Sequence, residues 1–372
     1  MNRLPKLLDR WHSLNLTTDD YERLGRKFKL EFNYNSNNIE GNALTYCQTE
    51  VLLESGEVIG NAKERDLEEM KAHDRCIMMV IQEALDEGHR LTEKFILELH
   101  RKMFSEDYTV QQDLAGGRSA SYTIHIGRYK TRTNSIITPQ GERFIYASPA
   151  DTPVMMSELV SWYNDAEASG EFNALELATL FHYRFLRIHP FEEGSGRIAR
   201  LLVNYILLRH HYPMIVVKSC EKARYIEALH KVDITANLMP SASANITAGQ
   251  LQPIISYFAD LLVKEIGENI RFIEDSDEDI WWTDGKFVRF KSPNTARMLN
   301  IISENPNISV RALTKMLGIN KSAVQKQLKN LQNNNYIIRA PGKHGELYVT
   351  AICTSGNALF PHTPETEEEH CQ

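Results

Sequence analysis

Residues 189–200, His-Pro-Phe-Glu-Glu-Gly-Ser-Gly-Arg-Ile-Ala-Arg, lie between two stretches whose apolar residues repeat at helical spacing. The first stripe ends at Ile188, and Pro190 predicts the end of a buried helix because the residue before a proline disfavours the α conformation. A second stripe begins at Ile198 and predicts another buried helix. The chain is therefore expected to build two packed helices joined by a short, glycine-rich turn.

The turn and the start of the second helix carry groups that suit an anion. Gly194 and Gly196 allow the backbone to approach a ligand closely. The free N–H groups at the start of the second helix favour a negative charge in the same space. Arg197 and Arg200 are three residues apart, so they share one helix face and suit phosphate oxygens.

Two further side chains in the turn suit phosphate chemistry. Glu193 offers a hard oxygen ligand for a Mg²⁺ ion shared with phosphates. His189 can accept a proton from an attacking hydroxyl group. Together with the anion cradle, these residues predict a site for phosphoryl or nucleotidyl transfer.

The stretch resembles the signature of the Fic (Fic/Doc) family, His-Pro-Phe-x-(Asp/Glu)-Gly-Asn-Gly-Arg-x-x-Arg. Every fixed position matches except one, because Ser195 stands where the family usually has Asn. Serine still offers a hydroxyl and the same backbone N–H, so we expect weakened rather than abolished nucleotide handling. The resemblance implies a mainly α fold, with a Fic-type helical core and a small β-hairpin flap.

The resemblance also implies an activity, namely transfer of AMP from ATP to a Tyr, Ser or Thr hydroxyl of a target protein, with Mg²⁺. In that assignment His189 is the general base, Glu193 binds Mg²⁺ and Arg200 holds the γ-phosphate. The α- and β-phosphates are then held by Gly194, Ser195, Gly196 and Arg197. Removal of AMP, or transfer of another phosphate-containing group, stays open as an alternative.

Two residues beyond the second helix stand where the family lines its adenine pocket. Tyr225 matches the tyrosine often found there, and Asp233 falls where the family has an Asn two turns later. The resemblance therefore assigns both to ATP binding. Core packing of Tyr225 is the competing interpretation.

A second motif lies at the Asn-rich end of a helix predicted over residues 18–38. Glu40 is placed at the helix C-terminus, where the dipole disfavours a carboxylate, so it calls for a cation partner. Ser36-x-x-x-Glu40-Gly41 also matches the family's inhibitory motif, (Ser/Thr)-x-x-x-Glu-(Gly/Asn). The resemblance implies that Glu40 borders the ATP site, pairs with Arg200 and inhibits the enzyme. A solvated Glu40 at a helix end is the alternative.

The segment between residues 116 and 149 has a β-rich sequence pattern, unlike the helical pattern that precedes it. Residues 43–115 are predicted to be mostly helical, whereas the short β-rich pieces 135–137 and 143–146 predict a hairpin. The family carries its flap at this position, so the resemblance implies that a target protein docks near residues 131–146 by strand addition. A plain surface hairpin is the alternative.

The C-terminal part is basic although the whole chain carries a net charge of −7. Between residues 288 and 350 ten Lys or Arg face two Glu, a net charge of +8. Apolar periodicity predicts three helices and two strands, over 295–304, 309–318, 320–331, 336–339 and 347–350. This order resembles a winged helix-turn-helix domain.

The predicted winged helix has two interpretations. Duplex DNA would be held through its phosphates, with Lys321, Ser322 and Gln325 facing outward from the recognition helix and Lys343 on the wing. Docking of a protein is the other, since folds of this kind are reused freely. A DNA-binding regulator whose Fic site only senses nucleotide is thus a rival function for the whole chain.

Three domains are expected along the chain. They are a Fic domain with its inhibitory segment over 1–285, ending near an acidic joint at 274–279, then a winged helix over 286–352 and a disordered tail over 353–372. The five scattered cysteines form no C-x-x-C pair, which favours a reducing cytoplasm. No stretch reaches the ~18 apolar residues that a membrane span needs. A homodimer is left open.

Overall fold

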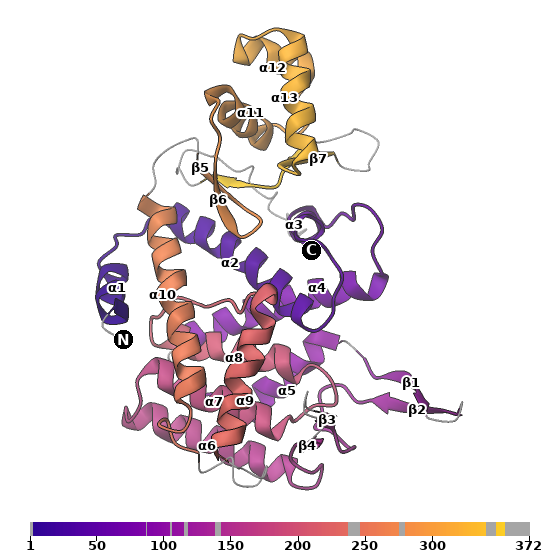
Figure 1. The fold of residues 1–372 in the computed structure, drawn as a ribbon, viewed down its shortest axis with the longest axis vertical. Helices are drawn as coiled ribbons and strands as arrows, with labels where there is room; N and C mark the ends of the chain where they lie inside the picture. The colour runs from indigo at the N-terminus through magenta and orange to yellow at the C-terminus, as the bar shows by residue number, and fades with distance from the viewer. Residues whose placement is uncertain are drawn as a thin grey trace, which may run out of the picture. The chain divides into compact units, whose positions relative to one another are not determined.

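The computed structural model describes residues 3–86, 88–104, 106–114, 118–137, 143–236, 246–274, 280–339 and 347–353 (Figure 1). The chain divides into two compact units, each made of separate segments. The first comprises Met1–Leu14, Phe28–Leu44 and Ala62–Glu268, and the second comprises Asn15–Lys27, Thr45–Asn61 and Asn269–Gln372. Residues 275–279 of the predicted acidic joint and residues 354–372 of the predicted tail lie outside the described residues. The linear boundary expected at residue 285 stays a prediction.

The first unit is built mainly from helices. Their bounds are α1 Arg3–His12, α2 Thr18–Ile39, α4 Glu64–Leu85, α5 Glu93–Phe104, α6 Thr152–Ser169, α7 Ala174–Ile188, α8 Ser195–Arg209, η1 Ser219–Glu221, α9 Lys222–Ala236 and α10 Gln252–Glu274. Helices α2 and α10 each contribute residues to both units. The two helices expected around residues 189–200 are therefore confirmed as α7 and α8.

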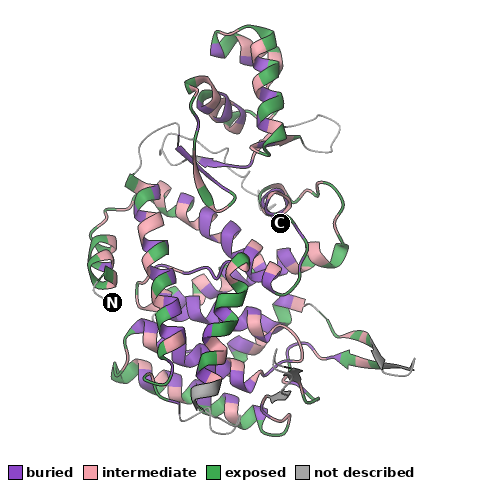
Figure 2. Ribbon diagram, viewed as in Figure 1, coloured by how far each residue is buried: buried purple, intermediate pink, exposed green. Residues whose placement is uncertain are grey.

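Helices α7 and α8 pack against each other and form the centre of the first unit's core. Every residue from Arg197 to Leu207 on α8 is buried, and α7 is buried along nearly its whole length (Figure 2). An amphipathic surface helix would bury only one stripe. Because α8 is covered on all sides, the arginines at its first turns must find partners inside the protein.

Two antiparallel hairpins accompany the helices. The predicted hairpin is confirmed as β3 Ser135–Ile137 paired with β4 Arg143–Ile145. A longer hairpin, β1 Tyr108–Leu114 with β2 Arg118–Ile124, projects away from the helices in Figure 1. Residues 43–115 are mostly helical, as predicted, although strand β1 at the end of this range was not predicted. Its polar, β-branched sequence has no apolar stripe to hold a helix on the core.

The second unit contains the expected winged helix. Its elements are α3 Tyr46–Ser55, β5 Ile280–Thr283, β6 Lys286–Arg289, α11 Pro293–Glu304, α12 Val310–Leu317, α13 Lys321–Asn333, β7 Ile337–Arg339, β8 Leu347–Val349 and β9 Ile352–Cys353. Strands β7 and β8 pair antiparallel, as expected for a wing. The three-stranded sheet β6-β5-β9 was not predicted.

Local caps explain why the helices of the second unit begin and end where they do. The side chain of Ser309 accepts the Ala312 N–H at 3.1 Å, and Asn320 accepts the Ala323 N–H at 2.8 Å. Gly318 ends α12 in the left-handed conformation, with φ 66°. On α13 the residues predicted to face outward, Lys321, Ser322 and Gln325, are exposed, whereas Lys343 lies outside the described residues. Within the described parts of the chain, no helix combines the length and apolar character that a membrane span requires.

Candidate active site

The turn between α7 and α8 is fixed at both ends by its backbone. His189 has φ 49° and donates its N–H to the Phe185 carbonyl at 2.9 Å, which closes α7. Such a conformation is uncommon for a residue other than glycine. At the other end, Gly194 has φ 84°, and a Cβ added there would lie 2.5 Å from the Phe104 ring. The turn therefore holds one shape, and α8 begins directly after it.

Ser195 braces this turn from within. Its hydroxyl accepts the Phe191 N–H at 3.1 Å and lies 3.3 Å from the Phe191 carbonyl. The ring of Phe191 is fully buried and stacks on His100 with centroids 3.9 Å apart. His100 in turn lies 3.1 Å from the Glu193 carbonyl and accepts the Gly127 N–H at 2.9 Å. The serine hydroxyl is thus engaged with the loop backbone, and His100 supports the loop through its ring and both of its nitrogens.

The imidazole of His189 is held on one nitrogen. Its Nδ1 lies 2.8 Å from Asn134 Nδ2 and 3.2 Å from the Phe191 carbonyl. The ring of Tyr146 stacks on it at 4.4 Å. Burial and the nearby charge of Lys130 lower the pKa of His189 to about 4. The ring is therefore neutral near pH 7, as a general base must be.

Arg200 is buried, and the end of α2 supplies its partners. Its guanidinium donates to Glu40 Oε1 at 2.8 Å, to the Ser36 hydroxyl at 3.0 Å and to the Ser36 carbonyl at 2.9 Å. Partial burial acts to raise the pKa of Glu40, but the positive charges of Arg200, Arg197 and Lys222 outweigh it and hold that pKa below its usual value. The structure thus brings together the two ends of the predicted inhibitory pair.

Gly196 shows where the Glu40 carboxylate lies. A Cβ built on Gly196 would lie 2.5 Å from Glu40 Oε1 and 3.3 Å from an Arg200 nitrogen. Gly196 belongs to the first turn of α8, where free N–H groups favour an anion. The carboxylate therefore sits against the surface that a phosphate would approach.

One face of α2 is attached to residues 218–222, which end in the first residue of α9. Three residues at four-residue spacing on α2 each contact that segment. The contacts are Lys218 with Glu31, the Ser219 N–H with Asn35 Oδ1 at 2.9 Å, and Lys222 Nζ with the Ile39 carbonyl at 2.6 Å. The last of these lies next to Glu40 and satisfies a carbonyl at the C-terminus of α2. This attachment fixes the position from which Glu40 reaches Arg200.

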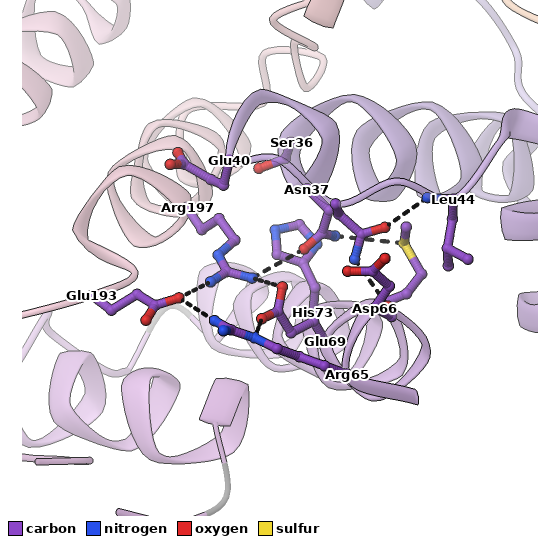
Figure 3. Close-up of polar contacts among 12 residues, drawn as sticks. Ser36, Asn37, Glu40, Leu44, Arg65, Asp66, Glu69, His73, Glu193 and Arg197 are labelled. Atoms are coloured by element: carbon purple, nitrogen blue, oxygen red, sulfur yellow. Dashed lines mark hydrogen bonds and ion pairs between the residues drawn. The ribbon is translucent and has the colours of Figure 1, made fainter. Parts of the chain in front are cut away.

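Arg197 is held by a second carboxylate (Figure 3). Its Nη1 contacts Glu69 Oε2 of α4 at 3.0 Å and Asn37 Oδ1 of α2 at 3.3 Å. Its Nη2 lies 3.6 Å from Glu193 Oε1. The guanidinium is almost completely buried, so these partners satisfy a charge that water cannot reach.

Glu193, the predicted Mg²⁺ ligand, is also engaged. Arg65 Nη2 lies 2.7 Å from Glu193 Oε1, and the Tyr108 hydroxyl donates to Oε2. Arg65 contacts Glu69 as well, at 2.7 Å, so the four side chains of Arg65, Glu69, Glu193 and Arg197 form one network (Figure 3). We call it the Glu69 network.

The side chains around Glu193 suit a Mg²⁺ ion that is shared with substrate phosphates. Within the described residues there is no group of three or more His, Cys, Asp or Glu that could hold a metal alone. Mg²⁺ is commonly bound by one or two carboxylates together with substrate phosphates. Glu193 fits such shared binding, provided that Arg65 releases its oxygen.

Tyr225 and Asp233 both lie on α9, and both have internal partners. The Tyr225 hydroxyl lies 2.8 Å from His182 Nε2, and burial raises the pKa of Tyr225 to about 12. Asp233 accepts the Tyr183 hydroxyl and contacts Arg187 at 3.1 Å. The adenine-binding role assigned to the two residues stays a prediction.

Several residues of the site have no sequence signal. Arg65 and Glu69 belong to a charged helix surface with no motif, although they reach Glu193 and Arg197 across the fold. The Asn-rich run around Asn37 predicts a helix end but not a contact with Arg197. Long-range pairing of this kind has no fixed spacing in the chain, so reading the sequence could not find it.

Comparison with known proteins agrees with the geometry. The family model described as Fic/DOC family matches residues 90–207, and the model described as MarR family matches residues 292–345. The crystal structure of a Fic domain containing signaling protein from Bacteroides thetaiotaomicron is 46% identical to this chain. It covers 72% of this chain and 96% of its own, with a TM-score of 0.67.

Two curated proteins, each called protein adenylyltransferase fic-1, are also similar. The one from Caenorhabditis briggsae is 27% identical over 78% of this chain and 49% of its own length. The one from Caenorhabditis elegans is 29% identical over 69% of this chain and 44% of its own. The chain thus spans about half the length of the curated relatives that it matches.

Proposed function

The chain belongs to the Fic/DOC family, and from that premise we propose that it is a protein adenylyltransferase inhibited by its own Glu40. The adenylyltransferases similar to it support this activity, although they are longer proteins. The observation that carries the inhibited state is the Glu40 carboxylate, which pairs with Arg200 at 2.8 Å beside the first turn of α8. An acidic side chain there occupies a place suited to phosphate.

In the proposed reaction a hydroxyl oxygen of the target attacks the α-phosphorus of ATP. The bond from that phosphorus to the bridging oxygen breaks, and pyrophosphate leaves. His189, neutral at pH 7, takes the hydroxyl proton. Backbone N–H groups at the start of α8 and the guanidinium of Arg197 hold phosphate oxygens in place. Mg²⁺, when bound, would be held by Glu193 and would neutralise phosphate charge.

Inhibition follows from competition for Arg200. While Glu40 holds that guanidinium, the γ-phosphate of ATP finds no partner there and meets a negative charge instead. ATP then lies with its α-phosphorus out of line with the incoming hydroxyl. A displacement of about 1 Å can cost ~10²-fold in rate.

The hairpin of β3 and β4 is proposed to dock the target. In the described part of the chain each of these strands pairs only with the other, so an edge can accept a further strand. Strand addition uses backbone hydrogen bonds and therefore tolerates different target sequences. We also place the protein in the cytoplasm, because its five cysteines are scattered along the chain and Cys47, Cys76 and Cys220 are free.

The test is transfer from ATP labelled on its α-phosphate. Glu40→Gly should incorporate label into protein ~10²-fold faster than the parent, and mass spectrometry should find AMP on a Tyr, Ser or Thr. Glu40→Gly combined with His189→Ala should be silent, because loss of a general base costs ~10²–10⁴-fold. ATP binding should survive His189→Ala, since the imidazole acts on the hydroxyl and not on the phosphates.

Two outcomes separate the explanations of a failure. If Glu40→Gly is no more active than the parent, adding Ser195→Asn to it distinguishes a disabled anion cradle from a Glu40 that does not inhibit. If His189→Ala loses ATP affinity in parallel with activity, the histidine is structural and the proposed base is wrong. A panel of labelled donors and AMP-modified proteins would reveal AMP removal or transfer of another group.

Binding of duplex DNA is a second candidate function, which the match to the MarR family model over residues 292–345 favours. The exposed face of α13 carries Lys321, Lys326 and Lys329. Affinity of the full chain for duplex DNA should fall steeply with salt, because each phosphate contact releases counterions. Neutralising these three lysines together should flatten the slope. Affinity that is independent of salt would argue for protein docking instead.

A further inference from the structure

Lys130 is a buried lysine beside the proposed base. The residue is 3% exposed, and in the described part of the chain no carboxylate forms an ion pair with it. The Nζ donates to the Ile188 carbonyl at 2.9 Å and to Asn134 Oδ1 at 2.9 Å. Its backbone N–H donates to the Pro190 carbonyl at 2.8 Å. The Nζ also lies 6.0 Å from the centre of the Tyr146 ring. A buried cation whose partners are all neutral groups is costly unless those contacts serve a purpose.

The ammonium group fixes which way the Asn134 amide faces. An ammonium has donors and no acceptor, so it can bind only the carbonyl oxygen of an amide. Asn134 Oδ1 must therefore face Lys130, and its NH₂ group must face the opposite side. On that side Nδ2 lies 2.8 Å from His189 Nδ1 and 3.2 Å from the Phe191 carbonyl. The two amide hydrogens match these two acceptors.

This orientation decides where the neutral imidazole carries its proton. Because an N–H of Asn134 points at Nδ1, that nitrogen must offer its lone pair. We propose that Lys130 and Asn134 are positioning residues that select the tautomer of His189 and hold its single proton on Nε2. The imidazole of this state has no lone pair at Nε2 for an incoming hydroxyl.

The proposal deepens the proposed function and rests on His189 as its general base. To act through Nε2, the ring must bind its proton at Nδ1, where the Phe191 carbonyl at 3.2 Å can accept it. The proton on Nε2 is released to solvent and another is taken up on Nδ1, so charge is conserved. This change requires Asn134 to rotate its amide or leave. Asn134 immediately precedes β3, so the residue that sets the tautomer is joined to the hairpin proposed to dock the target.

Imidazole ¹⁵N chemical shifts measure the tautomer without any turnover. The full chain labelled with ¹⁵N-histidine contains 13 histidines, and comparison with His189→Ala assigns the signals of His189. In the parent at pH 7 we expect the proton on Nε2. A proton on Nδ1 in the parent would overturn the proposal, whatever the variants do and whether or not the protein transfers AMP.

Variants then test the two residues. Asn134→Asp replaces the donor with a carboxylate that can accept from both Lys130 and Nδ1–H, so the proton should move to Nδ1. Lys130→Met lets the amide turn, and the ratio of the tautomers should shift by at least about tenfold because a charge-assisted hydrogen bond is lost. Asn164→Asp is the matched control, since Asn164 donates to the Leu91 carbonyl at 2.9 Å and does not contact His189. An unchanged tautomer in both Asn134→Asp and Lys130→Met would assign Lys130 to helix capping alone.

Discussion

Arg200 and Arg197 differ in how their carboxylate partners are held, although the two arginines are buried three residues apart on α8. Glu40, the partner of Arg200, lies just past the end of α2 and its side chain is 37% exposed. Glu69, the partner of Arg197, is 15% exposed and is also bound by Arg65, which binds Glu193 in turn. The pair of Glu40 with Arg200 can break when the Glu40 side chain alone moves. The pair of Glu69 with Arg197 belongs to the Glu69 network, so breaking it disturbs several side chains. We infer that the first works as a switch and the second as a structural support.

The largest effect, on the free energy of unfolding, should come from removing Glu69, the partner of Arg197. Glu69→Ala leaves the buried Arg197 charge without its main partner, which should lower the free energy of unfolding by about 3–5 kcal/mol. Glu40→Ala should cost only about 1 kcal/mol, because its carboxylate is partly solvated. Urea denaturation of both variants measures the difference. Equal losses would contradict the distinction between switch and support.

A smaller effect, on the rate of transfer, is expected from removing the hydrogen bond between Lys222 and the Ile39 carbonyl, which holds the end of α2 next to Glu40. Lys222→Met removes the donor to the Ile39 carbonyl next to Glu40, so transfer should rise by roughly tenfold, less than in Glu40→Gly. Lys231→Met on the same helix is the control, because Lys231 forms an exposed pair with Glu227. Transfer is measured with labelled ATP at saturating concentration. A rise in the control, or none in Lys222→Met, would argue against this role of the hydrogen bond.

The pair between Glu40 and Arg200 should lose its stabilising effect only at low pH. The pKa of Glu40 is held below its usual value in the folded protein, so the pair with Arg200 adds stability above the unfolded pKa. That stability, on the order of 1 kcal/mol, should be lost only as pH falls through the lower, folded value. The unfolding free energies of the parent and of Glu40→Gln should therefore differ by a constant amount between pH 7 and about 5. If the difference in unfolding free energy already disappears near pH 6, the pKa of Glu40 is not held below its usual value by Arg200.

The smallest effect concerns the exposed end of the Glu69 network. Arg65 is 60% exposed, so its pair with Glu193 should be worth only about 0.2–1 kcal/mol. Arg65→Met should release Glu193 and tighten binding of Mg²⁺ with ATP by about twofold to fivefold in calorimetry. Lys71→Met, which removes an exposed pair with Glu68 on the same helix, should change nothing. A weaker affinity in Arg65→Met would mean that Arg65 itself binds phosphate.

Reading the sequence could predict those parts of the site that are local in the chain. The turn at 189–200 has its base, carboxylate, glycines and arginines within twelve residues, between two apolar stripes. The winged helix was predictable because its helix caps, Ser309 and Asn320, and its Gly318 stop are local signals. Hairpin β1–β2 was not predicted: Ala120, Tyr122 and Ile124 alternate with polar residues on β2, but Gln111, Gln112 and Asp113 follow one another on β1 and interrupt the alternation there.

The sequence by itself determined which residues could do chemistry and where the helices around them begin and end, because caps, prolines and apolar periods act over a few residues. Only the tertiary structure decided which charges meet. It placed Glu69 on Arg197, Arg65 on Glu193, and Lys130 with Asn134 on His189. Helix packing sets these distances, and buried charges and amides must then take whatever partners the packed helices bring within reach.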